Sequence, residues 1–488
     1  LFPAEPATHF SYPDDGGRFT GAASRCVGVG KCRGHSGGVM CPSYRVTMEE
    51  EHSTRGRARL LAEMIRGDVI SNGWRSTEVR DALDLCLACK GCRKDCPVDV
   101  DMATYKAEFL SHHYARRLRP PAHYSMGWLP LWARMAAVAP RLVNAAARAP
   151  GLRELMKAVG GIAKERDLPS FAAQRVTDWY ARRGARPIGH RRGGGDMGRG
   201  QDTPHASEGA RVILWPDTFT NNFHPEVAKA AVSVLEDAGL TVDVPPARGT
   251  AGPLCCGLTW ISTGQLTTAK RVLGRTVSML ARRLQAGERV VVLEPSCAAV
   301  FRSDAPELLA TPDARLLAER TVTLAELLLE AGWQPPGEPV IGRRRKAIAQ
   351  VHCHQHAIMG FDADKQLLAR CGVDVRVLDS GCCGLAGNFG FERGHYEVSA
   401  ACAERGLWPA VREADPQTAI LADGFSCRTQ IAAARRAPES TTRRAQRSRY
   451  GIHLAQLLAD IAGFGAVSQD AAGQDAAGRE AVRFARRR

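Results

Sequence analysis

The sequence lacks any long apolar run that is free of charge. Its most apolar stretch, MGWLPLWARMAAVAPRLV at 126–143, carries two arginines and two prolines, so we expect no membrane-spanning helix. No basic start leads into an apolar segment, so no secretory signal is expected either. The first residue is Leu, which fits an unusual start codon as well as the downstream part of a longer chain. We expect a cytoplasmic protein, with peripheral contact at the inner face of the membrane as a further option.

The basic excess of the chain lacks the features of a nucleic-acid site. The formal net charge is +15, but much of it falls in arginine-rich stretches that resemble linkers or tails, such as ARRGARPIGHRRGGGDMGRG at 181–200 and RFARRR at 483–488. No basic motif interleaved with aromatic residues accompanies them. Such stretches are usually solvated and favour acidic lipid headgroups or an acidic partner. We therefore expect no nucleic-acid partner.

Cysteines carry most of the information. The chain has 16, none of them between Cys96 and Cys255, and without an export signal their clustering favours metal ligation over disulfides. The strongest motif is CLACKGCRKDCP at 86–97, which has the C-x2-C-x2-C-x3-C-P spacing of bacterial ferredoxins. Its first three thiolates can take three corners of a [4Fe–4S] cube, whereas the fourth commonly ligates another cluster. A zinc site is the alternative, although zinc usually takes two separated cysteine pairs. The predicted ligands of this run are Cys86, Cys89, Cys92 and Cys96.

A second, irregular group of cysteines precedes this run, in CVGVGKCRGHSGGVMCP at 26–42. If the usual exchange of ligands holds, Cys41 completes the cube of the first three ferredoxin-type cysteines. A second cluster, short of one thiolate, would then be held by Cys26, Cys32 and Cys96. His35 or a non-protein ligand could fill the open corner, the cluster could have three irons, or only one cluster forms here. Arg55 and Arg57, at the start of the predicted helix 53–67, either stabilise the charge of a reduced cluster or are simply solvated.

From 210 to about 460 the pattern is α/β and is repeated. The first copy reads as strand ARVILWPDT, helix HPEVAKAAVSVLEDAGL, strand TVDVPP, the tripeptide CCG, a helix and strand RVVVLEPSC. The second reads as strand KAIAQVHCHQH, helix DADKQLLARCGV, strand VDVRVLDSG, CCG, a helix and strand QTAILADGFSC. Gly239 and Gly372 stand where a helix would end. Short apolar strands that alternate with helices predict parallel sheets, at whose carboxyl ends the cysteines converge.

Adjacent cysteines followed by glycine can present both sulfurs to one inorganic core, because Gly257 and Gly384 permit a sharp turn. In the second copy four cysteines are enough for a [4Fe–4S] cluster: Cys353, Cys382, Cys383 and Cys427. A strained disulfide between neighbours is the alternative. In the first copy Asp217 or Thr218 stands where Cys353 would align, so we expect a degenerate site, with a labile cluster as the alternative. The cysteines of that copy are Cys255, Cys256 and Cys297.

The remaining candidates are weaker. We expect Cys371 and Cys402 to pack in the core, because Cys371 aligns with Ala238 and Cys402 lies in a helical pattern. Three histidines alternate around Cys353 and would share one face of an extended chain, which could suggest zinc. We favour hydrogen-bond donors or proton carriers near a cluster for them. These histidines are His352, His354 and His356.

The predicted architecture is multidomain, with a helical ferredoxin-like domain followed by a duplicated α/β cysteine-rich (CCG) domain with parallel sheets. The expected order is an N-terminal loop segment 1–25, a helical 4Fe–4S domain 26–110, a helical connector 111–185, a Gly/Arg-rich linker 186–209, CCG repeats 210–335 and 336–460, and a disordered tail 461–488.

CLACKGCRKDCP with the paired CCG turns resembles the iron–sulfur subunits of FAD-linked dehydrogenases, such as those for glycolate, D-lactate and anaerobic glycerol 3-phosphate. The stretches THFSYPDDGGRFTGAASRCVGVGKCR and DSGCCGLAGNFGFERGHYEVS are more similar to fused proteins in which an FAD-binding D-2-hydroxyacid dehydrogenase half precedes this half. The likeness covers about residues 8–460. It implies that FAD sits in a preceding segment, continuing into 1–25, or in a separate subunit.

The resemblance implies an electron-transfer module. Flavin reduced by a glycolate-, D-lactate- or D-2-hydroxyglutarate-like substrate would pass electrons to [4Fe–4S] clusters and on to a quinone or another carrier. The CCG module also resembles that of heterodisulfide reductase, which implies the alternative of a catalytic CCG cluster. That family's pattern ends in C-x2-C, whereas Gly424 and Glu294 stand at the first of the two cysteine positions here. The chain is expected to be an oxidoreductase component; no residue in it resembles a hydride-transfer or proton-abstraction site, so substrate oxidation is expected elsewhere.

Overall fold

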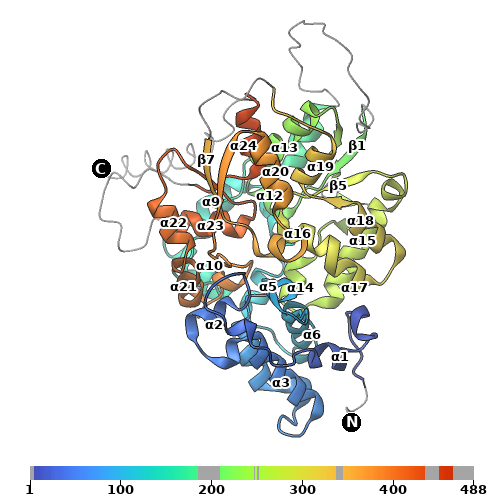
Figure 1. Ribbon diagram of the computed structural model, residues 1–488, viewed down its shortest axis with the longest axis vertical. Helices are drawn as coiled ribbons and strands as arrows, with labels where there is room; N and C mark the ends of the chain where they lie inside the picture. The colour runs from blue at the N-terminus through green and yellow to red at the C-terminus, as the bar shows by residue number, and fades with distance from the viewer. Residues whose placement is uncertain are drawn as a thin grey trace, which may run out of the picture.

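The computed structural model describes residues 5–184, 209–246, 248–249, 252–336, 345–434 and 450–464. Residues 186–208 of the linker expected at 186–209, and 465–488 of the tail expected at 461–488, lie outside the described residues. Figure 1 shows a helical N-terminal part at one end of the molecule, drawn in blue, and two small parallel sheets toward the other end. Among the described helices, none is both long and apolar enough to cross a membrane.

Short helices joined by tight turns make up the N-terminal part. Its longer helices begin at side-chain caps, since Ser53 accepts a hydrogen bond from Gly56 N, Ser76 from Val79 N and Asp101 from Thr104 N. The cysteines lie in or next to the turns that connect these helices. The helices are α1 Phe19–Ser24, α2 Pro42–Thr47, α3 Thr54–Arg66, α4 Thr77–Asp84, α5 Gly91–Asp95 and α6 Met102–His113, with 3-10 turns η1 Pro13–Asp15, η2 Lys31–Arg33, η3 Glu50–His52 and η4 Gly73–Arg75.

The connector is helical, as the sequence predicts. Proline stands in the first turn of three of its helices, where its fixed φ fits and its missing N–H costs nothing. Pro121, in the motif RPPAHY at 119–124, begins the first of these helices. The connector helices are α7 Pro121–Ser125, α8 Leu129–Ala136, α9 Pro140–Arg148, α10 Leu152–Gly160 and α11 Val176–Arg183.

The first sheet has four parallel strands in the order β2-β1-β5-β6. Leu214 of β1 pairs with Val291 of β5, which fixes the register used below. The strands are β1 Arg211–Leu214, β2 Thr241–Asp243, β5 Arg289–Val291 and β6 Thr321–Val322, with a separate antiparallel pair β3 Arg248–Gly249 and β4 Gly252–Pro253. The accompanying helices are α12 Thr218–Asn222, α13 Pro225–Asp237, α14 Leu258–Ser262, α15 Leu266–Gln285, α16 Pro295–Ala299, π-helical η5 Val300–Asp304, α17 Ala305–Leu309, α18 Pro312–Arg320 and α19 Leu324–Glu330.

The second sheet has three parallel strands in the order β8-β7-β9, with the first strand again in the centre. Ala349 of β7 pairs with Leu421 of β9. The strands are β7 Arg345–Ala349, β8 Val373–Val377 and β9 Ala419–Leu421. The accompanying helices are π-helical η6 Gln355–Met359, α20 Asp362–Arg370, 3-10 turn η7 Phe389–Phe391, α21 Tyr396–Glu404, α22 Leu407–Glu413, α23 Phe425–Ala433 and α24 Leu454–Ile461.

The predicted parallel sheets are therefore confirmed, but they are small and the fold is mostly helical. Gly239 and Gly372 have φ of +80° and +69° just past α13 and α20, so both end a helix as expected. Residues 461–464, which the sequence analysis assigned to the tail, still contribute to the fold, because Ile461 and Phe464 pack against the core that the two sheets share.

The hydrophobic cores cross the expected domain boundaries. One core joins the N-terminal helices to the first sheet unit, with Phe19, Leu61 and Phe109 in the same cluster as Leu273 and Phe301. A second core joins the two sheets, whose helices α13 and α24 pack on each other. The described parts therefore behave as one packed body, in which cysteines far apart in sequence can meet.

A buried lysine ties the N-terminal part to the first sheet unit. The Lys90 ammonium lies 2.7 Å from Asp101 Oδ2 and 2.8 Å from Asp304 Oδ1, and all three side chains are buried. Burial alone would lower the pKa of Lys90, but the two carboxylates outweigh it and raise the pKa. Burial likewise opposes ionisation of Asp101, yet the Lys90 charge brings the pKa of that carboxyl below its usual value.

We predict that Lys90→Met lowers the free energy of unfolding by about 3–5 kcal/mol, because it leaves the buried Asp304 carboxylate without its ion pair and Asp101 with Arg93 alone. The matched control is Arg289→Met, which removes a partly exposed pair with Glu330 and should cost less than about 1 kcal/mol. Chemical unfolding followed by far-ultraviolet circular dichroism measures both variants. Equal losses for the two would show that the buried pair does not anchor the units.

Candidate iron–sulfur centres

The ferredoxin-type run folds into a tight loop that gathers its cysteines. Cys86 and Cys89 follow α4, Cys92 lies in α5 and Cys96 ends it. Between them, Ala88 and Lys90 adopt left-handed backbone conformations with φ of 51° and 57°. These costly conformations bend the chain so that successive cysteines turn back toward a common side.

The upstream cysteine loop packs directly on this run at Gly91. A Cβ at Gly91 would lie 3.0 Å from Met40 N and from the carbonyl carbon of Val39, so only glycine lets the two loops approach. Asp95 binds the same segment of the upstream loop, because it accepts hydrogen bonds from Val39 N at 2.6 Å and Met40 N at 3.0 Å. The next residue, Cys41, is thereby fixed beside the run.

Cys41 lies between the two predicted groups of cysteines. Its Sγ accepts a hydrogen bond from Thr54 N at 2.9 Å. Its contact with Cys32, followed by burial, raises the pKa of Cys41 well above its usual value, and the nearby charge of Cys92 adds to this. The same contact lowers the pKa of Cys32 to about 6. The structure places Cys41 in contact with Cys32 but only within electrostatic reach of Cys92, so the exchange that assigns Cys41 to the ferredoxin-type cube stays a prediction.

The other predicted group is also assembled. Burial raises the pKa of Cys26, and the charges of Cys32 and Cys96 raise it further, which places these three thiols within electrostatic reach. The charge of Arg55 acts on Cys26 in the opposite direction. His35 is exposed and its ring lies 6.4 Å from that of Tyr44. In the described part of the chain, no hydrogen bond, ion pair or ring contact joins His35 to the three cysteines.

The two arginines at the start of α3 have different roles. Arg57 is buried, donates to Ala82 O at 2.7 Å and to Ser43 Oγ at 3.0 Å, and its charge lowers the pKa of Cys41. Arg55 instead pairs with Glu50 at 2.8 Å while it faces Cys26. Both cations therefore lie beside the cysteine loops, where they offset the negative charge of thiolates.

In the second sheet unit, the four predicted cysteines come together at the carboxyl ends of the strands. Cys382 contacts Cys353 and Cys383, and these contacts, followed by burial, raise its pKa well above the usual value. Cys383 in turn contacts Cys427, and its own pKa is lowered by the contacts with Cys382 and Cys427. Gly384, with φ of 86°, makes the turn, because a Cβ there would overlap Ser399 O.

All 16 cysteines are free thiols, so the alternative of a disulfide between neighbours is not realised in this structure. In the described ranges, no three or more His, Cys, Asp or Glu side chains converge so as to hold a single metal ion. Four buried thiols around a bent backbone, with backbone N–H groups directed at sulfur, are the donor set that a [4Fe–4S] cluster takes. Both the ferredoxin-type loop and the second CCG turn fit that cofactor.

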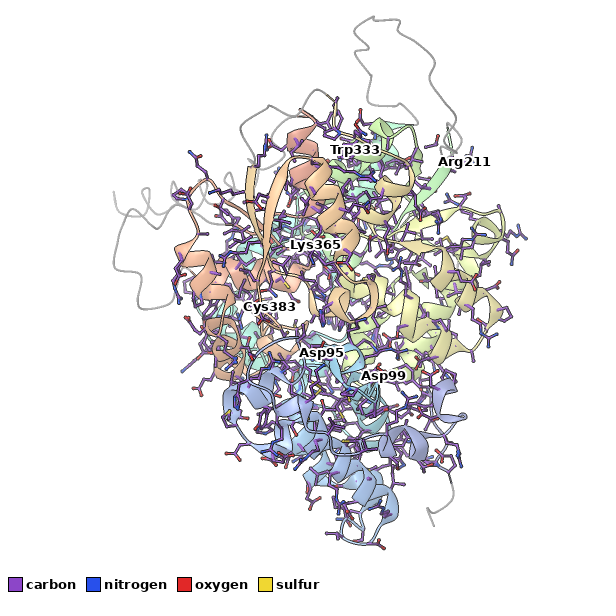
Figure 2. The ribbon with its side chains drawn as sticks, in the orientation of Figure 1. Asp95, Asp99, Arg211, Trp333, Lys365 and Cys383 are labelled. Atoms are coloured by element: carbon purple, nitrogen blue, oxygen red, sulfur yellow. The ribbon has the colours of Figure 1, made fainter. Side chains whose placement is uncertain are left out.

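The second sheet unit and the ferredoxin-type loop touch at their cysteines. His354 Nε2 lies 3.0 Å from Ala88 O, and His356 Nε2 lies 2.8 Å from Asp95 Oδ1. Burial raises the pKa of Cys89 well above its usual value, and the charge of Cys353 is the next largest cause. Figure 2 labels Asp95 and Cys383 on the two sides of this junction, where the N-terminal helices meet the second unit. One small apolar cluster holds Val39, Leu87, Cys89, Cys353, Cys382, Phe389 and Cys402.

The three histidines do not share one face, because the chain becomes helical at Cys353 and continues into η6. His354 and His356 contact the ferredoxin-type loop, whereas His352 packs on Gly424, at which any Cβ would overlap its ring. Burial lowers the pKa of His352 and of His354 to about 4 each. His354 donates its Nε2–H to Ala88 O, whereas His352 Nδ1 accepts from His354 N, so His352 can donate from Nε2.

The first sheet unit gathers only three cysteines. Cys256 Sγ lies 3.1 Å from Cys297 Sγ, and Cys255 Sγ accepts from Gly257 N at 3.4 Å. The register of the two sheets settles what replaces the fourth. Leu214 pairs with β5 at the same position of its sheet at which Ala349 pairs with β9 in the other sheet. Four residues after these two, Thr218 therefore occupies the place of Cys353, and its Oγ1 lies 3.9 Å from Cys255 Sγ.

The same register places Asp217 at His352 and Glu294 at Gly424. Asp217 caps α12 through Oδ1, while its buried Oδ2 has no hydrogen-bond partner. Burial raises the pKa of Asp217 to about 6, and the charge of Glu294 adds to it. The first unit thus replaces a thiol, an imidazole and a glycine by a hydroxyl and two carboxyls.

Two further cysteines differ in their surroundings. Cys371 ends α20 within the shared core, as expected, and burial raises its pKa to about 11. Cys402 is buried as expected, but it packs against the second CCG turn, with Sγ 3.6 Å from Pro42 O, and burial raises its pKa to about 12. Sequence reasoning also missed Asp95, for which its place between two ligand cysteines was the only signal.

Two family models match the chain. A "4Fe-4S dicluster domain" matches residues 22–100, and a "Cysteine-rich domain" (CCG) matches residues 217–302. No solved structure matches the chain. The matched ranges contain the ferredoxin-type loop and the three-cysteine site of the first unit.

Curated relatives are distant. D-2-hydroxyglutarate dehydrogenase of Escherichia coli K12 is 26% identical over 449 residues, which are 84% of this chain and 42% of that protein. One of the subunits of anaerobic glycerol-3-phosphate dehydrogenase from the same strain is 24% identical over 297 residues, 59% of this chain and 67% of that protein. Lactate utilization protein A 1 of Bacillus mycoides KBAB4 is 30% identical over 189 residues, 37% of this chain and 72% of that protein. The chain thus spans less than half of the D-2-hydroxyglutarate dehydrogenase and most of the two shorter relatives.

We predict that Thr218→Cys supplies the missing thiolate and raises the iron content by about four atoms per chain, the content of one cube. The reciprocal change Cys353→Thr should lower it by about four, whereas Cys371→Thr, a buried cysteine outside the groups, should leave it unchanged. Iron and acid-labile sulfide are measured on protein purified without oxygen. A loss in Cys353→Thr with no gain in Thr218→Cys would show that Asp217 and Glu294 keep a cluster out of the first unit.

Proposed function

Because the chain belongs to the proteins that combine a 4Fe–4S dicluster domain with a CCG cysteine-rich domain, we propose that it is the iron–sulfur electron-transfer module of an FAD-linked 2-hydroxyacid dehydrogenase. In this proposal electrons enter from the flavin of a preceding segment or a partner subunit and leave to a quinone or another carrier. The two sheet units are a duplicated CCG domain, of which the second keeps its full set of cysteines.

The contact between Cys89 and Cys353 carries the proposal. These residues belong to the two predicted four-cysteine groups. They lie far apart in the sequence and share one apolar cluster. Electron transfer between centres weakens steeply with distance, so a protein that relays electrons must hold its centres close together and away from water. The junction through His354 and His356 does both.

The state of the thiols supports metal binding over thiol chemistry. Burial and mutual contacts hold the pKa of Cys89, Cys382 and Cys427 well above the usual value. Buried thiols of this kind are poor nucleophiles, and a cluster of bare thiolates is costly away from water. Bound iron offsets that charge. A [4Fe–4S] cluster held at either site would supply one-electron transfer.

The chain's own groups set the conditions at these sites. Arg57 places positive charge beside the ferredoxin-type loop, which favours an added electron there, whereas Asp101 and Asp304 balance the charge of Lys90. Backbone N–H groups of Met102 and Thr54 are directed at Cys92 and Cys41, the kind of bond that raises a cluster potential.

Substrate oxidation is assigned to the flavin-bearing part. One relative's name specifies D-2-hydroxyglutarate and another glycerol 3-phosphate, and this chain spans only 42% of the first. Which 2-hydroxyacid is oxidised is therefore a property of the part that binds it.

Heterodisulfide-reductase-like catalysis at the CCG turn is the second candidate. It is favoured by a cavity that reaches Cys353. It is disfavoured by Gly424, because the His352 ring fills the space that the cysteine of a C-x2-C ending would need. A disulfide substrate that changed the spectrum of the iron-loaded protein would reverse this order.

We expect protein purified without oxygen to contain about eight irons when the helical part holds one cube and about twelve when it holds two, with matching sulfide and little zinc. Cys86→Ala should lose about four irons together with its electron paramagnetic resonance signal after reduction, because it removes a ligand of the cube. Cys371→Ala is the control and should keep both. Zinc without sulfide would contradict the electron-transfer function.

A further inference from the structure

A cavity of about 390 Å³ lies between the connector helices and the two sheet units. Its outer end is formed by α8–α10, where Trp132 is 43% and Met156 is 38% exposed. Its inner end is formed by Cys353 and His354, which are 4% and 7% exposed. The cavity therefore extends from the surface to a predicted ligand of the second CCG centre.

The lining indicates the chemistry of the ligand. Most of it is apolar, with aromatic rings from Trp132, Phe171 and Phe425. A few polar groups stand at the inner end, among them the imidazoles of His352 and His354. A largely apolar cavity with a few placed polar groups suits a flat apolar molecule with polar atoms at one end. In a module that delivers electrons, a quinone ring has this chemistry.

The three helices at the outer end turn apolar side chains to the solvent. Val138, Leu142 and Val159 are 87%, 73% and 70% exposed, and Met135 and Leu155 are exposed as well. Large apolar residues grouped on consecutive helices mark an interaction surface rather than ordinary surface composition. We call the exposed apolar side chains of α8–α10 the connector face.

The charges on these helices indicate what covers the connector face. They carry Arg134, Arg141, Arg148, Arg153 and Lys157 but one acid, Glu154. Arg141 and Arg148 are exposed. Helices that combine exposed apolar side chains with arginine lie in the interface of membranes with acidic lipids, and none of these helices is long enough to span one.

We propose that the connector face rests on an acidic membrane surface and that the cavity behind it binds a lipid-soluble quinone, admitted between α8 and α10. This proposal rests on the proposed electron-transfer function and names its acceptor and entry route. Quinone takes two electrons and two protons to give quinol; a reduced flavoprotein supplies the electrons and is reoxidised, and the bulk water supplies the protons. His352 donates a hydrogen bond from Nε2 toward a quinone oxygen, since its Nδ1 accepts from His354 N.

The membrane contact is tested by flotation of the iron-loaded full chain with vesicles of phosphatidylcholine alone or mixed with phosphatidylglycerol. Binding is expected to the acidic vesicles and to fall by about tenfold or more in Leu142→Glu and in Val159→Glu. Each change removes an apolar side chain that would insert into the lipid, and adds a charge that the acidic headgroups repel. Val69→Glu is the matched control, since Val69 is 80% exposed between α3 and α4, and should bind as the parent does.

The quinone site is tested by equilibrium binding of decylubiquinone to the same oxidised, iron-loaded protein. Ala147 lines the cavity from α9, so Ala147→Phe fills part of the space for the quinone. It should weaken binding by about tenfold or more, because the added ring and the quinone cannot occupy the same space. Ala145→Phe, on the exposed side of the same helix, should not. Val143→Trp fills the cavity one turn earlier and repeats the test independently of how Ala147→Phe folds.

The outcomes separate this inference from the function beneath it. Protein with full iron and sulfide that reduces ferricyanide but binds neither acidic vesicles nor decylubiquinone overturns the inference and leaves the electron-transfer module intact. Protein without iron and sulfide overturns the function itself. The inference also fails if Leu142→Glu abolishes binding to a purified flavoprotein or dissociates a dimer while vesicle binding matches Val69→Glu, because a protein would then cover the connector face.

Discussion

The structure depends on bringing cysteine sulfurs together away from water without joining them as disulfides. Next to each group of thiols the backbone adopts a positive φ, which L-residues rarely have. These positions are Ala88, Lys90 and Cys41 in the N-terminal part and Gly384 in the second sheet unit. Such bends are unfavourable in isolation and persist only where the surroundings impose them. Here the Lys90 ion pairs, the packing on Gly91 and the Asp95 hydrogen bonds do so. The residues that fix the loops are thus also those that join the units.

Comparison of the two sheet units shows how closely a site depends on its neighbours. The second unit has Cys353, His352 and Gly424, and the imidazole needs the glycine because any side chain there would overlap it. The first unit has Thr218, Asp217 and Glu294 at the same register, and its two carboxyls raise each other's cost of ionisation in a buried place. Loss of the leading cysteine therefore goes together with replacement of both groups that support it.

Sequence reasoning reached what is encoded locally. The spacing of Cys86 to Cys96 and the CCG tripeptides fix short loops, and apolar strands that alternate with helices predict parallel sheets whatever the rest of the chain does. It could not choose between Asp217 and Thr218, because only strand pairing sets the register. The extended reading of His352 to His356 failed because the chain is helical from Cys353 and continues into η6. The contact of His354 with Ala88, the burial of Cys402 at the CCG turn and the cavity all depend on segments that are distant in sequence.

The distribution of cores suggests a division of labour between the two sheet units. The first unit shares its largest core with the N-terminal helices and is tied to them by Lys90, but it lacks a complete thiol set. The second unit touches the same helices through a small cluster made largely of cysteines and their neighbours. Stability and contact between centres are thereby assigned to different halves of one repeated fold. A duplicated domain can lose a cofactor in one copy at little cost when that copy is held by apolar packing, whereas the copy whose contacts are its cysteines cannot.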